Sequence, residues 1–383
     1  MNILVIGAGM MGRAIAYDLS NNSNSKKITI ADKDKNRLKS AEKFLDNKNI
    51  CFDLLDVQNK DDVKIKFQKN DIVISAIPYH FNYILTKIAI DTKTHFLDLG
   101  GNNTTVKKQR SLFKKAEENK VLVIPDCGLA PGLTSIIVKD AVEVFDYVEY
   151  VKIRVGGLPQ KPVPPFNYQI LFSPNGLINE YVEDAIVLDN GKIVNKKSMT
   201  ELEEINFPKP FGKLEAFMTS GGCSTLPFTF KDKISYLDYK TIRYPGHCKK
   251  MKTFLDLGLG SEKEIFVGSK KIVPRNILID LLLKYVPTTG KDVTLIKVLS
   301  KGIKENEKFN LEYTTIDYYD ENNNITSMMR TTGYPVSIIA QMIEEGSISR
   351  NGVFGVEEVV PTNLFFDELK KRNIVIDRKI RKL

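Results

Sequence analysis

Near its start the chain joins an apolar run to three closely spaced glycines and then to residues with helical spacing, in VIGAGMMGRAIAYDL at residues 5–19. Gly7, Gly9 and Gly12 form the pattern G-x-G-x-x-G between a predicted strand and a predicted helix. Gly7 allows a tight turn, Gly9 lets a pyrophosphate approach the backbone, and Gly12 lets the helix lie against the sheet. The pattern therefore predicts a dinucleotide-binding turn, where free N–H groups and the helix dipole favour phosphate.

The elements that follow this turn alternate regularly through the first 145 residues. Strand-like apolar runs lie at 2–6, 27–31, 50–53, 71–76, 95–99 and 121–125, with helical patterns between them at about 9–20, 35–45, 60–69, 81–92 and 106–119. Alternation of this kind is typical of a doubly wound parallel sheet. We therefore predict an α/β fold whose Rossmann domain, at 1–130, binds NAD.

The pattern changes beyond that domain. YVEYVKIRVGGLP at 147–159 alternates polar and apolar residues, and further strand-like stretches lie near 185–195, 291–300 and 310–319, with a helical run at 275–285. This predicts a second, α+β domain with a mixed sheet at 131–335. A helix at 330–346, and a helix with a short strand at 363–380, are expected to form a C-terminal segment, 336–383, that returns to the Rossmann domain.

Composition limits the classes of partner. The 383 residues give enough length for two domains, and 42% hydrophobic and 27% charged residues are ordinary for a globular protein. The net charge of +9 comes from 56 Lys and Arg against 47 Asp and Glu, and the lysines are scattered among acidic residues. This indicates a solvated lysine-rich surface, so we expect neither a nucleic acid nor a membrane as a partner.

The cysteines and the N-terminus bear on the compartment. Cys51, Cys127, Cys223 and Cys248 form no C-x-x-C pair and have no regular spacing. This fits a reducing cytosol and argues against a disulfide framework or a zinc site, so we expect no metal. A strand predicted almost at Met1 leaves no room for a signal peptide, and no apolar run approaches the roughly 18 residues of a membrane span. We therefore expect a cytoplasmic protein.

An acidic residue at the end of the second strand bears on the type of dinucleotide. Asp32 lies 20 residues after Gly12. A carboxylate there binds both ribose hydroxyls of NAD and repels the 2′-phosphate of NADP. Lys33 and Arg37 lie close by in the sequence and leave NADP open. The alternative is a packing turn in which Asp32 is an ordinary helix cap.

Other positions are assigned to the cofactor by their order along the sheet. Met10 and Met11 belong to the glycine turn, and Asp53 follows the third strand, where an adenine usually lies. Ala76 and Pro78, in SAIP at 75–78, follow the fourth strand, at the switch point where ligands collect. Pro78 fits a simple turn residue equally well.

Several later motifs resemble a known family. DCGLAPG at 126–132, after the sixth strand, is similar to the end of the Rossmann domain in the saccharopine dehydrogenase-like superfamily. Longer stretches resemble its L-lysine 6-dehydrogenase branch: VGGLPQKPVPPFNYQILFSPNGLINEYVEDAIVLDNGKIV at 155–194, LEAFMTSGGCSTL at 214–226, TIRYPGH at 241–247 and SMMRTTGYP at 327–335. Together these motifs span most of the chain, in order.

The resemblance implies oxidation of the ε-amine of L-lysine with NAD⁺. The products would be ammonia and 2-aminoadipate 6-semialdehyde, which cyclises to a piperideine carboxylate. It also implies that the second domain binds the substrate and forms a homodimer or a higher homo-oligomer. Sister branches act on saccharopine or on carboxylated polyamines, and a non-catalytic NAD-binding protein is a further alternative on the same fold.

This chemistry sets requirements for the site. An ammonium has no lone pair to assist hydride loss, and a free lysine amine has a pKa near 10.4. The site must therefore remove a proton, by desolvation or with a base within hydrogen-bond reach. It must also supply a donor for the α-carboxylate and an acceptor for the α-ammonium.

Seven residues are candidates for these tasks. Asp126 and Cys127 follow the sixth strand at the cofactor edge, and His247 is a candidate base or water-positioning residue. The planar guanidinium group of Arg243 can donate two parallel hydrogen bonds to a carboxylate, so Arg243 is the candidate to bind the substrate carboxylate. Further candidates to contact the substrate are Tyr168, beside Tyr181, and Glu215. The alternatives are a small buried thiol for Cys127, an ion pair for Arg243, a structural histidine for His247, and core packing for the tyrosines.

Overall fold

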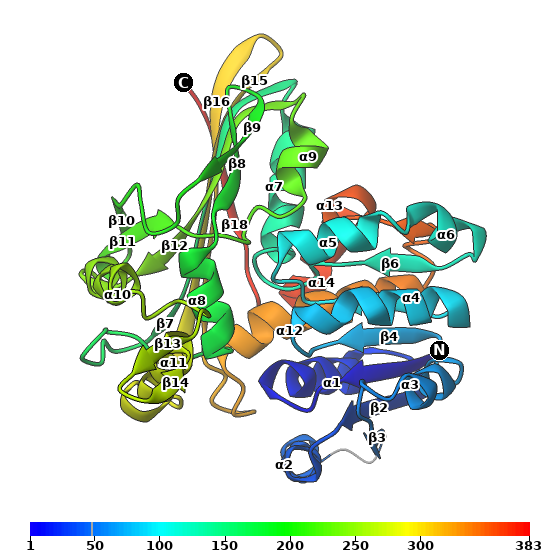
Figure 1. Cartoon of the computed structure of the whole chain (residues 1–383). Helices are drawn as coiled ribbons and strands as arrows, with labels where there is room; N and C mark the ends of the chain where they lie inside the picture. The colour runs from blue at the N-terminus through cyan, green and yellow to red at the C-terminus, as the bar shows by residue number, and fades with distance from the viewer. Residues whose placement is uncertain (47–48) are drawn as a thin grey trace. The chain divides into compact units, whose positions relative to one another are not determined.

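The chain forms two compact units in the computed structural model, which describes residues 1–46 and 49–383 (Figure 1). Unit 1 comprises Met1–Asp140, Ser224–Thr229 and Met329–Val375, and unit 2 comprises Ala141–Cys223, Phe230–Met328 and Ile376–Leu383. Residues 131–140, Ser224–Thr229 and 329–335 belong to unit 1, although they were predicted for the second domain, and Ile376–Leu383 belongs to unit 2.

Unit 1 contains a parallel sheet whose strands run, within the described residues, in the order β17-β6-β5-β4-β1-β2-β3. The strands are β1 (Asn2–Ile6), β2 (Lys27–Asp32), β3 (Ile50–Leu54), β4 (Ile72–Ser75), β5 (His95–Asp98), β6 (Leu122–Ile124) and β17 (Gly352–Val353). Central strands such as β4 are buried throughout, because helices cover both faces of a parallel sheet. The predicted doubly wound sheet is confirmed.

The helices of this half follow the strands in turn. They are α1 (Met10–Asn22), α2 (Lys35–Leu45), α3 (Lys60–Phe67), α4 (Asn82–Thr92), α5 (Asn103–Arg110) and α6 (Phe113–Glu118), with a short 3-10 turn, η1 (Tyr79–Phe81). The helix predicted at 106–119 is thus two helices. Near the end of α5, the buried side chain of Gln109 donates to Asp98 Oδ2 at 2.7 Å.

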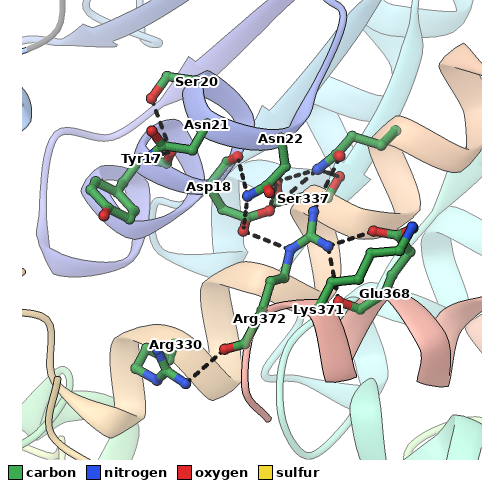
Figure 2. Close-up of polar contacts among 11 residues, drawn as sticks. Tyr17, Asp18, Ser20, Asn21, Asn22, Arg330, Ser337, Glu368, Lys371 and Arg372 are labelled. Atoms are coloured by element: carbon green, nitrogen blue, oxygen red, sulfur yellow. Dashed lines mark hydrogen bonds and ion pairs between the residues drawn. The ribbon is translucent and has the colours of Figure 1, made fainter.

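The C-terminal segment of unit 1 packs against α1 (Figure 2). Arg372, just after α14 (Thr362–Lys371), donates from Nε to Asp18 Oδ1 at 2.6 Å, and Ser337 of α12 (Ser327–Glu344) donates to Asp18 Oδ2 at 2.7 Å. Gly333 of α12 has room only for hydrogen, since a Cβ there would stand 2.9 Å from the Cβ of Ala14. The residues that end this segment therefore hold the helix that begins at the glycine turn.

The last strand, unlike the segment before it, belongs to unit 2. β18 (Asp377–Lys382) pairs antiparallel with β16 (Glu307–Tyr318) in unit 2. Its sequence DRKIRK is exposed throughout, which suits an edge strand because charges there discourage pairing with other chains. The expectation that the whole of 336–383 returns to the Rossmann domain is therefore wrong for these final residues.

Unit 2 contains a mixed sheet, as predicted, in the order β10-β11-β12-β7-β15-β16-β18, with the hairpin β8–β9 attached to β12. Only β7 and β12 pair in parallel within the described ladders of this sheet. Its strands include β7 (Tyr147–Pro159), β8 (Ala185–Asp189), β9 (Lys192–Lys196), β10 (Glu203–Phe207), β11 (Gly212–Met218), β12 (Ile234–Arg243) and β15 (Asp292–Lys304), and a separate hairpin is formed by β13 (Ile265–Val267) and β14 (Lys270–Ile272). The helices of unit 2 are α8 (Pro174–Val182), α10 (His247–Asp256) and α11 (Pro274–Tyr285). Three further helices lie wholly or mostly in unit 1: α7 (Leu133–Val144), α9 (Leu226–Phe230) and α13 (Val356–Val359).

The sequence prediction missed several of these strands. The single strand expected at 185–195 is the hairpin β8–β9, which turns at Asn190 and Gly191, both with positive φ as two-residue hairpin turns require. β12 was not predicted because it buries Asp238, Lys240 and Arg243 among its apolar residues, which hides its apolar pattern. Among the described helices, none has the length and apolar character needed to cross a membrane.

Candidate functional site

The glycine turn has the shape that a dinucleotide requires. Gly7 has a φ of +107°, and a Cβ there would stand 2.7 Å from the carbonyl oxygen of Ala76; a Cβ on Gly12 would overlap the Gly7 carbonyl. A Cβ on Gly9 would meet no atom within 4 Å, and no side chain caps α1 at this residue. The turn is therefore closed on the side of the sheet and open at the helix N-terminus, and it fits a pyrophosphate.

Asp32 lies at the end of β2, against the same turn. Its Oδ2 accepts from the backbone N–H of Ala8 at 2.8 Å, and its Oδ1 accepts from Asp34 N–H at 2.9 Å. The N-cap of α2 is Asp34, which accepts from Asn36 and Arg37. The helix-cap alternative for Asp32 is therefore wrong, and its carboxylate belongs to the glycine turn.

The other predicted cofactor residues are placed less uniformly. Met10 and Met11 open α1 and are half-buried, while Ala76 and Pro78 follow β4, with Pro78 exposed. Asp53 lies within β3 rather than after it, and its carboxylate forms an ion pair with Lys66. Asp53 therefore has a partner of its own, which weakens its assignment to the adenine.

Asp126 is buried in unit 1. Its Oδ2 accepts from the Ser224 hydroxyl, whereas its Oδ1 is buried without a hydrogen-bond partner among the described residues. Its φ is +62°, and Gly100 must be glycine because a Cβ there would overlap the Asp126 carboxylate. A strained backbone holding an unsatisfied carboxylate oxygen is typical of a functional site.

The sequence prediction missed the carboxylate beside it. Asp98, at the end of β5, accepts from Gly100 N–H at 2.8 Å and from Asp126 N–H at 3.3 Å. Burial raises the pKa of Asp126 to about 7, and the charge of Asp98 acts in the same direction; burial also raises the pKa of Asp98 to about 6. The pair can therefore hold or release a proton near neutral pH. The strand-end position in DLGG at 98–101 was the available signal.

Cys127 is fully buried next to this pair. Its thiol donates to the carbonyl of Ile124 at 3.2 Å. Burial, together with the charges of Asp98 and Asp126, raises the pKa of the Cys127 thiol well above its ordinary value. The thiol is thus neutral, and its environment fits the alternative of a small buried residue better than a catalytic role.

In unit 2, a second group of buried polar residues surrounds Arg243. We call Tyr168, Glu180, Tyr181, Tyr239, Arg243 and His247 the Arg243 cluster. Arg243, 3% exposed, donates from Nε to the Tyr181 hydroxyl at 3.1 Å and from Nη1 to the carbonyl of Ile242 at 2.9 Å. Its guanidinium lies 4.8 Å from the centre of the Tyr168 ring. No described residue accepts from its Nη2, so this buried cation keeps an open donor.

His247 supports this arrangement. Its Nδ1 lies 3.1 Å from the carbonyl oxygen of Phe166, which can only accept, so Nδ1 carries the proton and Nε2 accepts from the Tyr181 hydroxyl at 3.1 Å. Burial, with a contribution from Arg243, lowers the pKa of His247 to about 3. A neutral imidazole with both nitrogens engaged matches the structural alternative, and it orients Tyr181 rather than offering a free base.

The two glutamates near this cluster differ. Glu215 on β11 accepts from Gly246 N–H at 2.8 Å and Cys248 N–H at 2.7 Å, so it caps α10 and has little capacity left for a substrate. Glu180 on α8, which the sequence prediction missed, has no side-chain hydrogen bond to any described residue. Burial raises its pKa to about 7, against the opposing charge of Arg243. Its only signal was the EY pair at 180–181.

A polar cleft of about 530 Å³ also lies in unit 2. Its lining includes Glu149, Arg154, Glu203, Asp238 and Lys240. These charges pair among themselves or with neighbours: Arg154 with Asp238 and Glu203, Lys240 with Glu203, and Glu149 with Lys301. The cleft therefore offers a ligand fewer open charges than the Arg243 cluster does.

The comparisons with known proteins agree over the whole chain. Residues 3–124 match the family described as Saccharopine dehydrogenase NADP binding domain, and residues 128–375 match Saccharopine dehydrogenase C-terminal domain. The chain is 23% identical to the mitochondrial alpha-aminoadipic semialdehyde synthase of Rattus norvegicus, over 92% of this chain but only 45% of that protein, so it spans about half the length of such relatives.

Two yeast comparisons extend over full length. Saccharopine dehydrogenase [NADP(+), L-glutamate-forming] of Saccharomyces cerevisiae is 23% identical over 97% of each chain. The solved structure of apo saccharopine dehydrogenase (L-Glu forming) from the same yeast has a TM-score of 0.80 at 20% identity, covering 99% of each chain, and so shares the fold. With both family domains matched in order, the chain belongs to the saccharopine dehydrogenase family.

Proposed function

We propose that this chain is a pyridine-nucleotide-dependent oxidoreductase that oxidises the bond between the ε-carbon and the nitrogen of L-lysine. NAD⁺ would accept the hydride from the ε-carbon, leaving an imine, and water would hydrolyse the imine to ammonia and 2-aminoadipate 6-semialdehyde. The observation that carries the proposal is the buried guanidinium of Arg243, which has neutral hydrogen-bond partners and no acceptor for its Nη2 among the described residues. A buried cation of this kind is expected to bind a carboxylate, such as that of an amino acid.

Family membership supports the reaction type. The name of the rat relative contains alpha-aminoadipic semialdehyde, which is the proposed aldehyde product. The yeast relative is named as forming L-glutamate from saccharopine. Release of glutamate from saccharopine breaks the bond between the nitrogen and the ε-carbon of the lysine part. The same bond in free lysine would release ammonia, so the two reactions share the oxidised carbon.

The residues of this chain have separable tasks in the proposed reaction. A nicotinamide ring, when bound, supplies the hydride acceptor. The glycine turn and Asp32 would hold the nucleotide, with Asp32 favouring NAD⁺ because a carboxylate repels the 2′-phosphate of NADP⁺. The open Oδ1 of Asp126 would accept a proton from the substrate ammonium, since the pKa of Asp126 is raised to about 7 by burial.

Tyr181 and His247 would act indirectly. The chain of hydrogen bonds from Arg243 through Tyr181 to His247 and Phe166 fixes the guanidinium. Burial raises the pKa of Tyr168 to about 12 and raises that of Tyr181 further, so both phenols stay neutral. The cation is therefore held without being neutralised, and the substrate carboxylate would supply the missing charge.

A saccharopine dehydrogenase activity is the second candidate, favoured by the yeast relative's name. Saccharopine carries two carboxylates more than lysine. Among the buried arginines of the described part of unit 2, Arg154 pairs with Asp238 and Arg275 pairs with Glu262, whereas no described carboxylate pairs with Arg243. This supports a substrate with one carboxylate to be bound in unit 2.

The test is a substrate screen. The protein is incubated with NAD⁺ or NADP⁺ and with L-lysine or saccharopine, and the reduced nucleotide, ammonia and glutamate are measured. We expect NADH and ammonia from lysine. No reduced nucleotide from lysine up to alkaline pH, together with glutamate released from saccharopine, would transfer the assignment to the second candidate. No calorimetric heat with either nucleotide would overturn the oxidoreductase proposal itself.

A further inference from the structure

The Arg243 cluster of unit 2 contains two groups of opposite charge that do not pair, the buried Arg243 and the half-buried Glu180. Tyr181 follows Glu180 directly in α8, and its hydroxyl accepts from Arg243 Nε at 3.1 Å. The backbone carbonyl of Glu180 accepts from Ser220 N–H at 2.9 Å, and the charge of Glu180 acts to raise the pKa of Arg243. No ion pair joins Glu180 to Arg243 among the described residues, and each keeps unused hydrogen-bond capacity. Charges removed from water normally pair, because an isolated buried charge costs several kcal/mol. An open anion beside an open cation therefore indicates a ligand that carries both charges.

The surroundings of Glu180 fix its position. α8 begins at Ser173, whose hydroxyl accepts from Gly176 N–H, and near its end the backbone carbonyl of Glu180 accepts from Ser220 N–H at 2.9 Å. Gly222 allows this turn to lie flat on the Tyr239 ring, since a Cβ would overlap the ring. A Cβ on Gly221 would meet nothing within 4 Å, so the turn leaves open space next to it.

The other polar groups of the cluster are unsuited to bind a cation. Glu215 is saturated by two backbone N–H groups of the α10 N-terminus. The Tyr181 hydroxyl is committed to Arg243 and His247, and the Tyr239 hydroxyl accepts from Thr241 at 3.5 Å. The Tyr168 hydroxyl has no partner among the described residues, but it is a neutral group. Only Glu180 supplies a negative charge with free acceptors.

We propose that Glu180 binds the α-ammonium of the substrate while Arg243 binds its α-carboxylate, so that the Arg243 cluster selects the free α-amino-acid end. This inference rests on the proposed function, in which the opposite end of the same molecule is oxidised. The ammonium and carboxylate of an amino acid share one carbon, and they therefore require two receptors that are close but not bonded to each other. The α-end thus determines which amines are accepted, independently of the reacting ε-carbon.

The experiment compares lysine with two analogues, each lacking one α-group. 6-Aminohexanoate lacks the α-amine, and cadaverine lacks the carboxylate. We expect wild type to have a higher kcat/KM for lysine than for 6-aminohexanoate. Glu180→Gln should lower kcat/KM for lysine by roughly 10–100-fold, because a charge-assisted hydrogen bond to the α-ammonium is lost. The same variant should change kcat/KM for 6-aminohexanoate by less than about threefold, because this analogue has no α-ammonium. The matched control is Glu204→Gln, on the exposed side of β10, which should leave kcat/KM unchanged for lysine and for 6-aminohexanoate.

Each outcome has a consequence. Equal losses for lysine and 6-aminohexanoate in Glu180→Gln, with unchanged melting temperature, would overturn the assignment of Glu180. Retained 6-aminohexanoate turnover shows at once that the variant is folded. If wild type turns over no ε-amine, the proposed function fails. Recognition of the α-amino-acid end by Glu180 and Arg243 is then tested separately, by calorimetry of the NAD⁺-loaded protein with lysine and with 6-aminohexanoate. Equal affinity of wild type for lysine and 6-aminohexanoate would overturn the assignment of Glu180 to the α-ammonium as well.

Discussion

Arg154 on β7 and Arg243 on β12 are two buried arginines of the same sheet, and they are used differently. Each donates from Nη1 to the carbonyl of the preceding residue at 2.9 Å. Arg154 adds two bonds to Asp238, at 2.7 and 3.0 Å, and an ion pair with Glu203. Arg243 meets a phenol instead of carboxylates and keeps one nitrogen open. Carboxylates of the protein balance the charge of Arg154, whereas no described carboxylate pairs with Arg243.

The same contrast appears among the buried aspartates of unit 1. Asp18 accepts from Arg372, Ser337, Gln341 and Asn22, so both of its oxygens are satisfied. Asp126 has one oxygen bonded to Ser224 and one without a partner among the described residues. Burial alone therefore does not mark a functional charge. Unused hydrogen-bonding capacity in a buried charged group is the more discriminating sign.

The largest effect is expected on stability, at Arg154. Arg154→Ala leaves Asp238 buried without its cation, which should lower the free energy of unfolding by about 4–5 kcal/mol. Urea unfolding measures this loss. Replacing both partners, with Arg154→Met and Asp238→Leu together, should recover most of it. A single variant as stable as wild type would remove the distinction between the two arginines.

The next effect is on catalysis, at Asp126. Asp126→Asn should lower kcat for lysine roughly a thousandfold, within the range of general-base catalysis. In wild type the protonated carboxyl cannot accept a proton, so activity should rise with pH through about 7, the raised pKa of Asp126. The neutral fraction of the substrate amine rises in the same direction, about tenfold per pH unit below its pKa. A flat pH profile in wild type contradicts both steps.

A smaller loss is expected at Arg243. Arg243→Ala should lower kcat/KM for lysine roughly 100-fold, or about 3 kcal/mol, because the α-carboxylate loses its charged donors. Cadaverine, which has no carboxylate, should be affected by only a few-fold. Arg243→Lys should restore part of the loss, since lysine keeps the charge without the fork. An equal loss with cadaverine would mean that Arg243 holds the fold, as Arg154 does.

The smallest effect is expected at the nucleotide. Asp32→Asn should raise the Kd for NAD⁺ roughly tenfold, or about 1.4 kcal/mol. The variant should also bring the Kd for NADP⁺ closer to that for NAD⁺, because the carboxylate that repels the 2′-phosphate is lost. Calorimetry measures both affinities. Circular dichroism should remain unchanged, because the amide oxygen can still accept from Ala8. Unchanged NAD⁺ affinity would place the ribose elsewhere.

The sequence predicted the Rossmann half well and the second half less completely. β1 and β4 are continuous apolar runs bounded by turns, and the glycine turn has a spacing that needs no distant contact. β12 escaped prediction because its buried Asp238, Lys240 and Arg243 are compensated by residues far along the chain.

The candidate site was predictable only in part, for the same reason. Arg243 and His247 were identified by residue type, but the bond from Arg243 to Tyr181 spans 62 residues and fixes roles that spacing cannot show. Glu180 and Asp98 were missed because carboxylates on a helix or at a strand end are usually solvated. Only burial, and the absence of a partner for Glu180 within the described residues, distinguish them.

The bond between Asp18 and Arg372 has a consequence for biosynthesis. Asp18 belongs to the helix that begins at the glycine turn, and its cation is 354 positions later. During translation the first six strands emerge long before Arg372, so the Asp18 carboxylate of α1 lacks its cation until Arg372 has left the ribosome. Unit 1 therefore cannot complete its packing before Arg372 has been made, although its first strands are made early.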